Sequence, residues 1–217
     1  MIKIKICGIT NLVDARAAVE AGADMLGFNF YRPSPRFIEP QNARVMIDTL
    51  RSGFARLDRT VMMVGVFVNE SLPETVQEIA DEAGAEAVQL HGNESPEFCR
   101  QVKGLLKNRL IIKVLRVTKD FVADRALQYD VGAIMLDAFD KELYGGTGRT
   151  VDWTIARRVR DLGVSLFLAG GLSPENVMAA ISSVQPYAVD ACSALETLPG
   201  RKDAARMKAF VRAVHTG

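Results

Sequence analysis

Eight short segments rich in β-branched and other apolar residues recur along the chain. Each is followed by a turn and then by a helix-length segment rich in Ala, Arg and Glu. This alternation is typical of successive βα units and favours a parallel sheet. The 217 residues divided by eight give about 27 residues per unit, which suits a single (β/α)8 TIM barrel of α/β class. The predicted strands span residues 2–7, 25–30, 62–68, 86–90, 110–115, 132–136, 164–168 and 187–191. The predicted helices span residues 12–21, 40–51, 73–83, 95–103, 119–127, 152–161, 174–182 and 203–214.

The repeat also bears on domain organisation. No Ser/Gly linker, low-complexity tract or block of like charges interrupts it, so residues 1–217 are predicted to form one barrel domain. An open doubly wound sheet would use the same repeat, but its strands tend to read as continuous apolar runs. The first strand alternates instead, with Lys5 and Cys7 on the face opposite Ile4 and Ile6. The same period groups polar residues near other strand ends, namely Gln89 with His91, Met135 with Asp137, and Asp190 with Cys192.

Charge and composition exclude several classes of protein. The 27 Lys and Arg against 26 Asp and Glu leave a net charge of +1, so the chain lacks a general electrostatic footprint for nucleic acid or an anionic membrane. The longest apolar run covers residues 61–68, far short of the roughly 20 residues of a membrane-spanning helix. Three widely spaced cysteines predict neither a disulfide framework nor a metal site, and they suit a reducing cytoplasm.

The segment after the seventh strand predicts a phosphate site. It passes through Gly170 and Gly171 into a helix start, where Ser173 is the expected N-cap. Glycine lets backbone amides approach an anion, and a helix amino terminus presents unpaired N–H groups. A tight turn without a ligand is the alternative. A second glycine cluster at 144–148 lacks the features of a nucleotide motif, so a ligand-contacting loop and a plain surface loop both stay open.

Two residues at strand ends are candidates for proton transfer. Cys7 ends the first strand, where a barrel enzyme places its site, although a lone cysteine is more often a small buried hydrophobe. Lys5, one pleat repeat below on the same face, is a cation that favours the thiolate. Asp137 ends the sixth strand in apolar surroundings that raise a carboxyl pKa, which suits an acid; helix capping is the alternative.

Two further residues are candidates for substrate contact. Arg36 lies in a proline-stiffened loop and is suited to a bidentate pair with a carboxylate, although a solvated surface arginine is the default. His91 follows the fourth strand as the single internal histidine, and a structural or substrate-contacting role fits it better than metal binding.

Together these segments resemble the phosphoribosylanthranilate isomerase family, barrel enzymes of tryptophan biosynthesis. The resemblance rests on Lys5-Ile6-Cys7-Gly8-Ile9-Thr10, Gly27-Phe28-Asn29-Phe30, Ser34-Pro35-Arg36, Gly65-Val66-Phe67-Val68-Asn69, Val88-Gln89-Leu90-His91-Gly92, Leu136-Asp137, Tyr144-Gly145-Gly146-Thr147-Gly148, Ala169-Gly170-Gly171-Leu172, Ala188-Val189-Asp190 and Pro199-Gly200-Arg201-Lys202-Asp203. They follow the family's order from end to end of the chain.

The resemblance implies an Amadori rearrangement of N-(5-phosphoribosyl)anthranilate without a cofactor or metal. It implies that Cys7 is the general base, that Asp137 is the general acid, and that Arg36 contacts the anthranilate carboxylate. The remaining expected contacts are His91 with the substrate, Asp190 with the ribose-derived hydroxyls, and Gly170, Gly171, Ser193 and Ala194 with the phosphate. The expected partner is a small-molecule sugar phosphate, with no nucleic acid and no membrane, and a monomer is expected although a homodimer stays open.

One segment departs from the family. After the aspartate the family commonly has Val-Ser-Ser-Gly, whereas this chain has Ala191-Cys192-Ser193-Ala194. If the last position requires positive φ, alanine costs on the order of 1 kcal/mol and weakens phosphate binding. This segment is the support for a catalytically weakened or silent sugar-phosphate-binding barrel. The related aminoimidazole carboxamide ribotide isomerase, with two aspartates, is a rival that Cys7 disfavours. Beneath the mouth we expect an inward polar set of compensating charges, namely Lys5, Lys113, Asp137 and Asp190.

Overall fold

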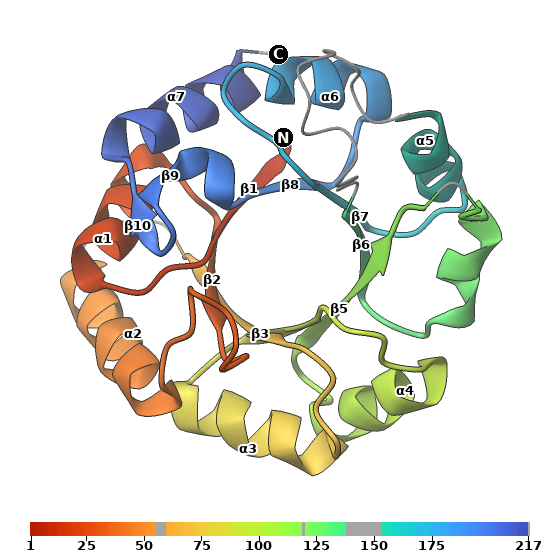
Figure 1. Cartoon of the computed structure of the whole chain (residues 1–217), viewed down its shortest axis with the longest axis horizontal. Helices are drawn as coiled ribbons and strands as arrows, with labels where there is room; N and C mark the ends of the chain where they lie inside the picture. The colour runs from red at the N-terminus through yellow and green to blue at the C-terminus, as the bar shows by residue number, and fades with distance from the viewer. Residues whose placement is uncertain (55–59, 119, 138–152, 217) are drawn as a thin grey trace.

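Eight parallel strands follow one another in chain order around a closed barrel, and the helices form a ring outside it (Figure 1). This computed structural model describes residues 1–54, 60–118, 120–137 and 153–216. The strands are β1 (Lys3–Cys7), β2 (Met25–Asn29), β3 (Met62–Phe67), β4 (Ala87–Leu90), β5 (Leu110–Arg116), β6 (Ala133–Asp137), β7 (Leu166–Ala169) and β8 (Ala188–Ala191). The barrel closes where β1 pairs with β8. The predicted α/β barrel is therefore confirmed.

The helices begin where the sequence supplies caps. The side chains of Asn11, Ser95 and Asp203 accept hydrogen bonds from backbone amides of the first turns that follow them, which satisfies amides that a helix leaves unpaired. The helices are α1 (Leu12–Ala21), α2 (Pro40–Phe54), α3 (Pro73–Ala83), α4 (Pro96–Leu105), α5 (Trp153–Asp161), α6 (Val177–Val184) and α7 (Ala204–His215). In the described ranges, no helix combines the length and apolar character needed to cross a membrane.

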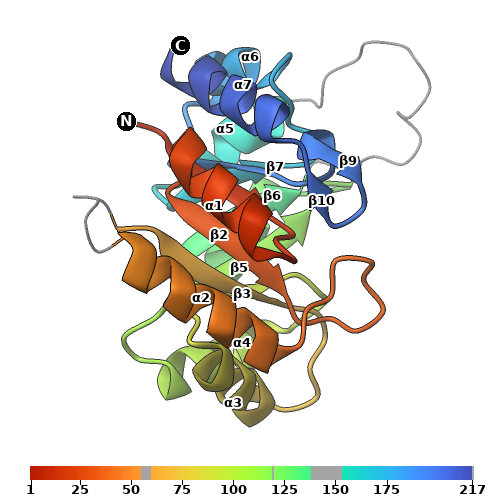
Figure 2. The same cartoon turned by 90° about the vertical axis from the view of Figure 1, so that its left-hand side faces the viewer.

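Three segments differ from the sequence predictions. The fifth predicted helix, at 119–127, is replaced among the described residues by a 3-10 helix, η1 (Ala123–Gln128). The helix predicted at 174–182 begins later, because Ser173 and Asn176 close a hydrogen-bonded turn in front of α6. After β8, the short 3-10 helix η3 (Ser193–Leu195) leads into an unpredicted hairpin of β9 (Glu196–Leu198) and β10 (Arg201–Lys202). Figure 2 shows this hairpin at the same end of the barrel as the loop after β2.

The apolar core has two parts, which correspond to the two faces of the strands. A large cluster between strands and helices includes Ile4 and Ile6, and a smaller cluster fills the barrel interior. The interior members are Met25, Val64, Ala87, Ile112, Val114, Ala133, Met135, Phe167, Ala169 and Ala188. Lys5, opposite Met25 in the ladder, lies on the interior face, as the alternation of β1 predicts.

Lys113 lies on the other face of its strand. It stands between Leu90 of β4 and Ile134 of β6, which both belong to the cluster that packs against the helices. Its neighbours Ile112 and Val114 take the interior positions. The prediction that Lys113 belongs to an inward polar set is therefore wrong. Because β5 is apolar on both sides of this lysine, the sequence carried no alternation from which its face could be read.

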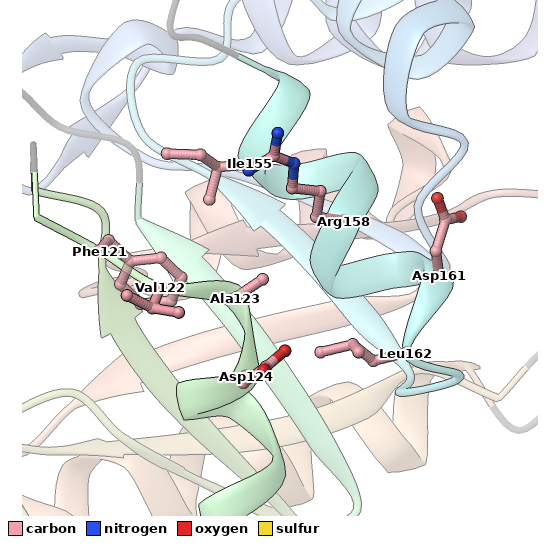
Figure 3. Close-up of a pocket in the computed structure, with 8 residues that line it drawn as sticks. All are labelled: Phe121, Val122, Ala123, Asp124, Ile155, Arg158, Asp161 and Leu162. Carbon is pink, nitrogen blue, oxygen red and sulfur yellow. The ribbon is translucent and has the colours of Figure 1, made fainter.

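A depression of about 430 Å³ lies outside the barrel, between η1 and α5. Figure 3 shows Ile155 and Leu162 pointing from the region of α5 toward the segment 121–124. The six-residue 3-10 helix η1 is shorter than the α-helix expected there, and it leaves this side of α5 partly uncovered. The depression has no lining residue from a strand end, which is where (β/α)8 enzymes build their sites.

Candidate active site

The carboxyl ends of the strands surround a pocket of about 220 Å³. It is smaller than the depression beside α5, but polar groups from many parts of the chain converge on it. All the site residues singled out from the sequence line it: Cys7, Arg36, His91, Asp137, Gly170, Gly171, Asp190, Ser193 and Ala194. The structure thus brings the whole predicted set together. The glycine cluster at 144–148 lies outside the described residues.

Cys7, Lys5 and Asp190 form a buried group on the side of β1 and β8. Lys5 is fully buried and its Nζ lies 2.7 Å from Oδ1 of Asp190. Burial alone lowers the pKa of Lys5, but the carboxylate of Asp190 and the sulfur of Cys7 raise it above its usual value. Burial, with a contribution from Cys7, raises the pKa of Asp190 to about 6 although Lys5 opposes this. The buried Lys5 cation therefore interacts with two acidic groups, the carboxyl group of Asp190 and the thiol of Cys7.

The Cys7 thiol has an environment that favours the thiolate. A hydrogen bond from Cys192 lowers the pKa of Cys7 most; burial opposes this, and Lys5 and Lys202 add to the lowering. The sequence-based expectation that Lys5 favours the thiolate agrees with this direction. The backbone of Gly8 packs closely against the thiol of Cys192, since a Cβ added to Gly8 would lie only 2.9 Å from Sγ of Cys192.

Arg36 is held at the edge of the pocket by a carboxylate that the sequence analysis did not single out. Nε of Arg36 lies 2.9 Å from Oε1 of Glu196, and Nη2 lies 2.6 Å from Oε2. Lys202 of β10 approaches the same carboxylate at 2.8 Å and lies 3.7 Å from Sγ of Cys192. Burial raises the pKa of Glu196, but the hydrogen bonds and positive charges of Arg36 and Lys202 outweigh burial and hold this pKa below its usual value.

The signal that could have located this pair was weak. Glu196 and Lys202 belong to the hairpin after β8, which no periodicity predicts, and the Arg36–Glu196 contact spans 160 positions of sequence. Lys202 appears only within the Pro199-Gly200-Arg201-Lys202-Asp203 segment of the family resemblance.

His91 and Asp137 meet on the opposite side of the pocket. Nε2 of His91 lies 3.2 Å from Oδ2 of Asp137, while Nδ1 lies 3.0 Å from Nε2 of Gln89. Which ring nitrogen carries the proton depends on the tautomer of the imidazole; the form that accepts from the Gln89 amide at Nδ1 donates from Nε2 to Asp137. The carboxyl of Asp137 is 21% exposed and has this polar partner. The sequence analysis inferred apolar surroundings for Asp137, and the structure adds His91 as a polar partner.

The loops after β7 and β8 form the remaining wall. Gly170 and Gly171 both adopt positive φ, at 89° and 67°, a conformation that favours glycine. Asn176 supports this turn, because its Nδ2 donates to the carbonyl oxygen of Gly171 and its Oδ1 accepts from the amide of Ser173. Ala194 is not among the described residues with positive φ. The strain that would have weakened phosphate binding at this position is therefore absent from the described backbone.

Comparisons with known proteins all match this chain to one protein family. Residues 4–213 match the protein family described as N-(5'-phosphoribosyl)anthranilate (PRA) isomerase. A protein of Geobacter sulfurreducens named N-(5'-phosphoribosyl)anthranilate isomerase is 46% identical over 212 residues, which is 98% of each chain. The crystal structure of phosphoribosyl anthranilate isomerase from Thermotoga maritima has a TM-score of 0.84 and 41% identity, with full coverage of both chains. A structure of such an isomerase in complex with reduced 1-(o-carboxyphenylamino)-1-deoxyribulose 5-phosphate has a TM-score of 0.82 and 40% identity, also with full coverage.

Proposed function

Because the chain belongs to the N-(5'-phosphoribosyl)anthranilate isomerase family, we propose that Cys7 and Asp137 are the general base and general acid of its reaction. The protein is an isomerase of tryptophan biosynthesis, which converts phosphoribosylanthranilate to 1-(2-carboxyphenylamino)-1-deoxyribulose 5-phosphate. The observation that carries the assignment is that Cys7, at the end of β1, and Asp137, at the end of β6, line one pocket.

The reaction needs one proton donor and one proton acceptor. Asp137, protonated, donates to the furanose ring oxygen; the C1–O bond breaks and an iminium forms between C1 and the anthranilate nitrogen. The Cys7 thiolate then removes the proton from C2, whose acidity the iminium raises, and the resulting enolamine tautomerises to the ketone. The low pKa of Cys7 supports its role as base. His91, whose Nε2 contacts Oδ2 of Asp137, holds the carboxyl group in place at the pocket wall.

The other lining residues bind the substrate. Glu196 takes Nε–H and one N–H of Nη2 of Arg36, so Nη1 and the second N–H of Nη2 are left for the anthranilate carboxylate. Lys5 occupies Oδ1 of Asp190, which leaves Oδ2 for a sugar hydroxyl. Gly170 and Gly171, together with the backbone of Ser193 and Ala194, receive the phosphate. Because Ala194 has no positive φ, we do not favour the silent binding barrel as a second function.

The proposal is tested by loss of anthranilate-type fluorescence when the purified protein meets enzymatically generated phosphoribosylanthranilate. We expect an active parent and, for both Cys7→Ser and Asp137→Asn, a fall in kcat of about 10²-fold or more. Cys99→Ser is the matched control, because this thiol is buried in α4 away from the pocket, and it should keep the parental rate. Full activity in both site variants would falsify the assigned acid and base. An inactive parent that still binds the product would favour a binding protein.

The partner is a small sugar phosphate, and the monomeric state and the cytoplasmic location stay predictions. Light scattering of the purified enzyme at several concentrations tests the first. A molar mass near twice that of the 23.7 kDa chain would replace the monomer with the homodimer.

A further inference from the structure

Two of the three cysteines lie next to each other at the point where the barrel closes. Cys7 ends β1, and Cys192 directly follows β8. These strands are parallel neighbours in which Ile6 stands opposite Ala191, so Cys7 and Cys192 occupy the next opposite positions along the two backbones. Both line the active-site pocket. The strand register therefore brings two thiols to one wall of the pocket.

The geometry suits a covalent bond between them. Neighbouring strands lie about 4.7–4.9 Å apart, and a disulfide joins α-carbons about 4.4–6.8 Å apart. The two thiols are free, and the interaction with Cys192 is the largest cause of the lowered pKa of Cys7, which indicates that the two side chains lie close together. The strand register therefore places the two cysteines at a backbone separation that a disulfide can span.

The charges around the pair favour reaction at Cys7. Lys5 contacts Cys7, and Nζ of Lys202 lies 3.7 Å from Sγ of Cys192. Such cations stabilise a thiolate, which is the form of cysteine that attacks an oxidant. Cys192, as the hydrogen-bond donor, has a raised pKa and stays a thiol until Cys7 has reacted. An attacking thiolate with a neighbouring second thiol is the arrangement of cysteines that are oxidised reversibly.

We propose that Cys7 and Cys192 form an oxidation site for small hydroperoxides, in which Cys7 reacts first and Cys192 closes a disulfide with it. The Cys7 thiolate attacks the terminal peroxide oxygen; the O–O bond breaks, Cys7 becomes a sulfenic acid, and the alkoxide or hydroxide that leaves takes up the proton released when the Cys7 thiol ionised, which gives an alcohol or water. Cys192 then loses its proton, attacks the Cys7 sulfur and displaces hydroxide, which takes up that proton. In sum, two thiols and one hydroperoxide give a disulfide, an alcohol and water, and a dithiol reductant reverses the oxidation.

The consequence rests on the proposed function, because the disulfide removes the thiolate assigned as general base. Bond formation itself does not depend on that assignment. The pair also departs from the pattern of the family, which by the resemblance commonly has serine at position 192. Cys99 offers the contrast within the same molecule: it is fully buried in α4, and burial raises its pKa to about 11.

The test is mass spectrometry of the full chain after treatment with hydrogen peroxide, with alkylation of the remaining free thiols. We expect the parent to lose the mass of two hydrogen atoms, to yield a peptide that links Cys7 to Cys192, and to keep Cys99 alkylated. Cys99→Ser should form the same link. Cys192→Ser should form none, and its Cys7 should instead be oxidised further to sulfinic acid, which dithiothreitol does not reverse.

Isomerase activity separates this inference from the proposed function. If both hold, peroxide abolishes the parent's activity and dithiothreitol restores it, whereas Cys192→Ser loses its activity irreversibly. A disulfide that forms without loss of activity supports the oxidation site and contradicts Cys7 as the base. A parent whose Cys192 stays fully alkylated after Cys7 has been oxidised overturns the oxidation site, whatever the activity.

Discussion

Two of the buried lysine–carboxylate pairs look alike as ion pairs but differ in their surroundings. Nζ of Lys5 lies 2.7 Å from Asp190 inside the barrel, and Nζ of Lys113 lies 2.6 Å from Glu94 on its outer side. The two lysine side chains are 0% and 1% exposed. The first pair lies beside a thiol at the wall of a pocket, whereas the second fastens the loops that follow β3 and β4.

The difference lies in how completely the hydrogen-bonding groups are used. Lys113 donates to Glu94 and to the carbonyl oxygens of Leu90 and Gly92, which matches the three donors of an ammonium group. Glu94 also accepts from the backbone amides of Asn69 and Gly92. Such a complete set of partners leaves nothing for a ligand, so this pair is architectural.

The inner pair, Lys5 with Asp190, leaves hydrogen-bonding capacity unused. Asp190 receives Lys5 on Oδ1 and lines the pocket, and Lys5 shares its charge with Cys7. Buried polar groups are normally satisfied, so a carboxylate that keeps acceptor capacity at a pocket wall indicates a place for a ligand hydroxyl. The comparison teaches that burial of an ion pair does not mark an active site, whereas unused hydrogen-bonding capacity toward a pocket does.

The largest expected effect comes from breaking the inner pair. Lys5→Met removes the cation beside Cys7 and leaves Asp190 buried without its partner, so the pKa of Cys7 rises and kcat/KM at neutral pH falls about 10²-fold or more. The pH dependence of thiol alkylation and of kcat/KM measures both effects. An alkylation profile that matches the parent's would contradict the electrostatic role of Lys5.

Breaking the outer pair should affect stability instead. Lys113→Met leaves Glu94 as a buried charge without its cation, which costs about 3–5 kcal/mol in free energy of unfolding. Urea unfolding measures this loss, and the pH profile of Cys7 alkylation should stay parental. If the profile shifted as much as in Lys5→Met, the two pairs would not differ in the way described.

Removing both charges sharpens the contrast. Lys113→Met combined with Glu94→Leu should be less destabilised than the sum of the single variants by about 0.5–3 kcal/mol, because neither change then leaves an unpaired charge. Lys5→Met combined with Asp190→Asn should recover stability in the same manner but no activity. Recovery of activity by this double variant would show that the inner pair is also purely architectural.

The two pairs also show what the sequence can and cannot predict. The alternation in β1 places Lys5 and Cys7 correctly, because polar and apolar side chains take opposite faces there. Lys113 has apolar residues on both sides, so no period assigns its face, and the prediction for it is wrong. The eight strands and the set of pocket residues were predictable from local patterns and from the family resemblance. The partners Glu94 and Glu196 lie in loop and hairpin segments and contact Lys113 and Arg36 from 19 and 160 positions away, and Lys202 belongs to a hairpin that no periodicity predicts.

The smallest expected effect is a pH dependence of stability from the inner pair alone. The pKa of Asp190 is raised to about 6 from the value of 3.8 that we take for the unfolded chain, so between these values the folded state binds more protons. Stability therefore falls as pH rises through this window, by about 1 kcal/mol between pH 5 and pH 6. Urea unfolding across this range measures the slope. Asp190→Asn should remove that contribution, whereas Glu94→Gln, which leaves Asp190 in place, should keep it. A slope that Glu94→Gln removes and Asp190→Asn keeps would assign the proton to the outer pair.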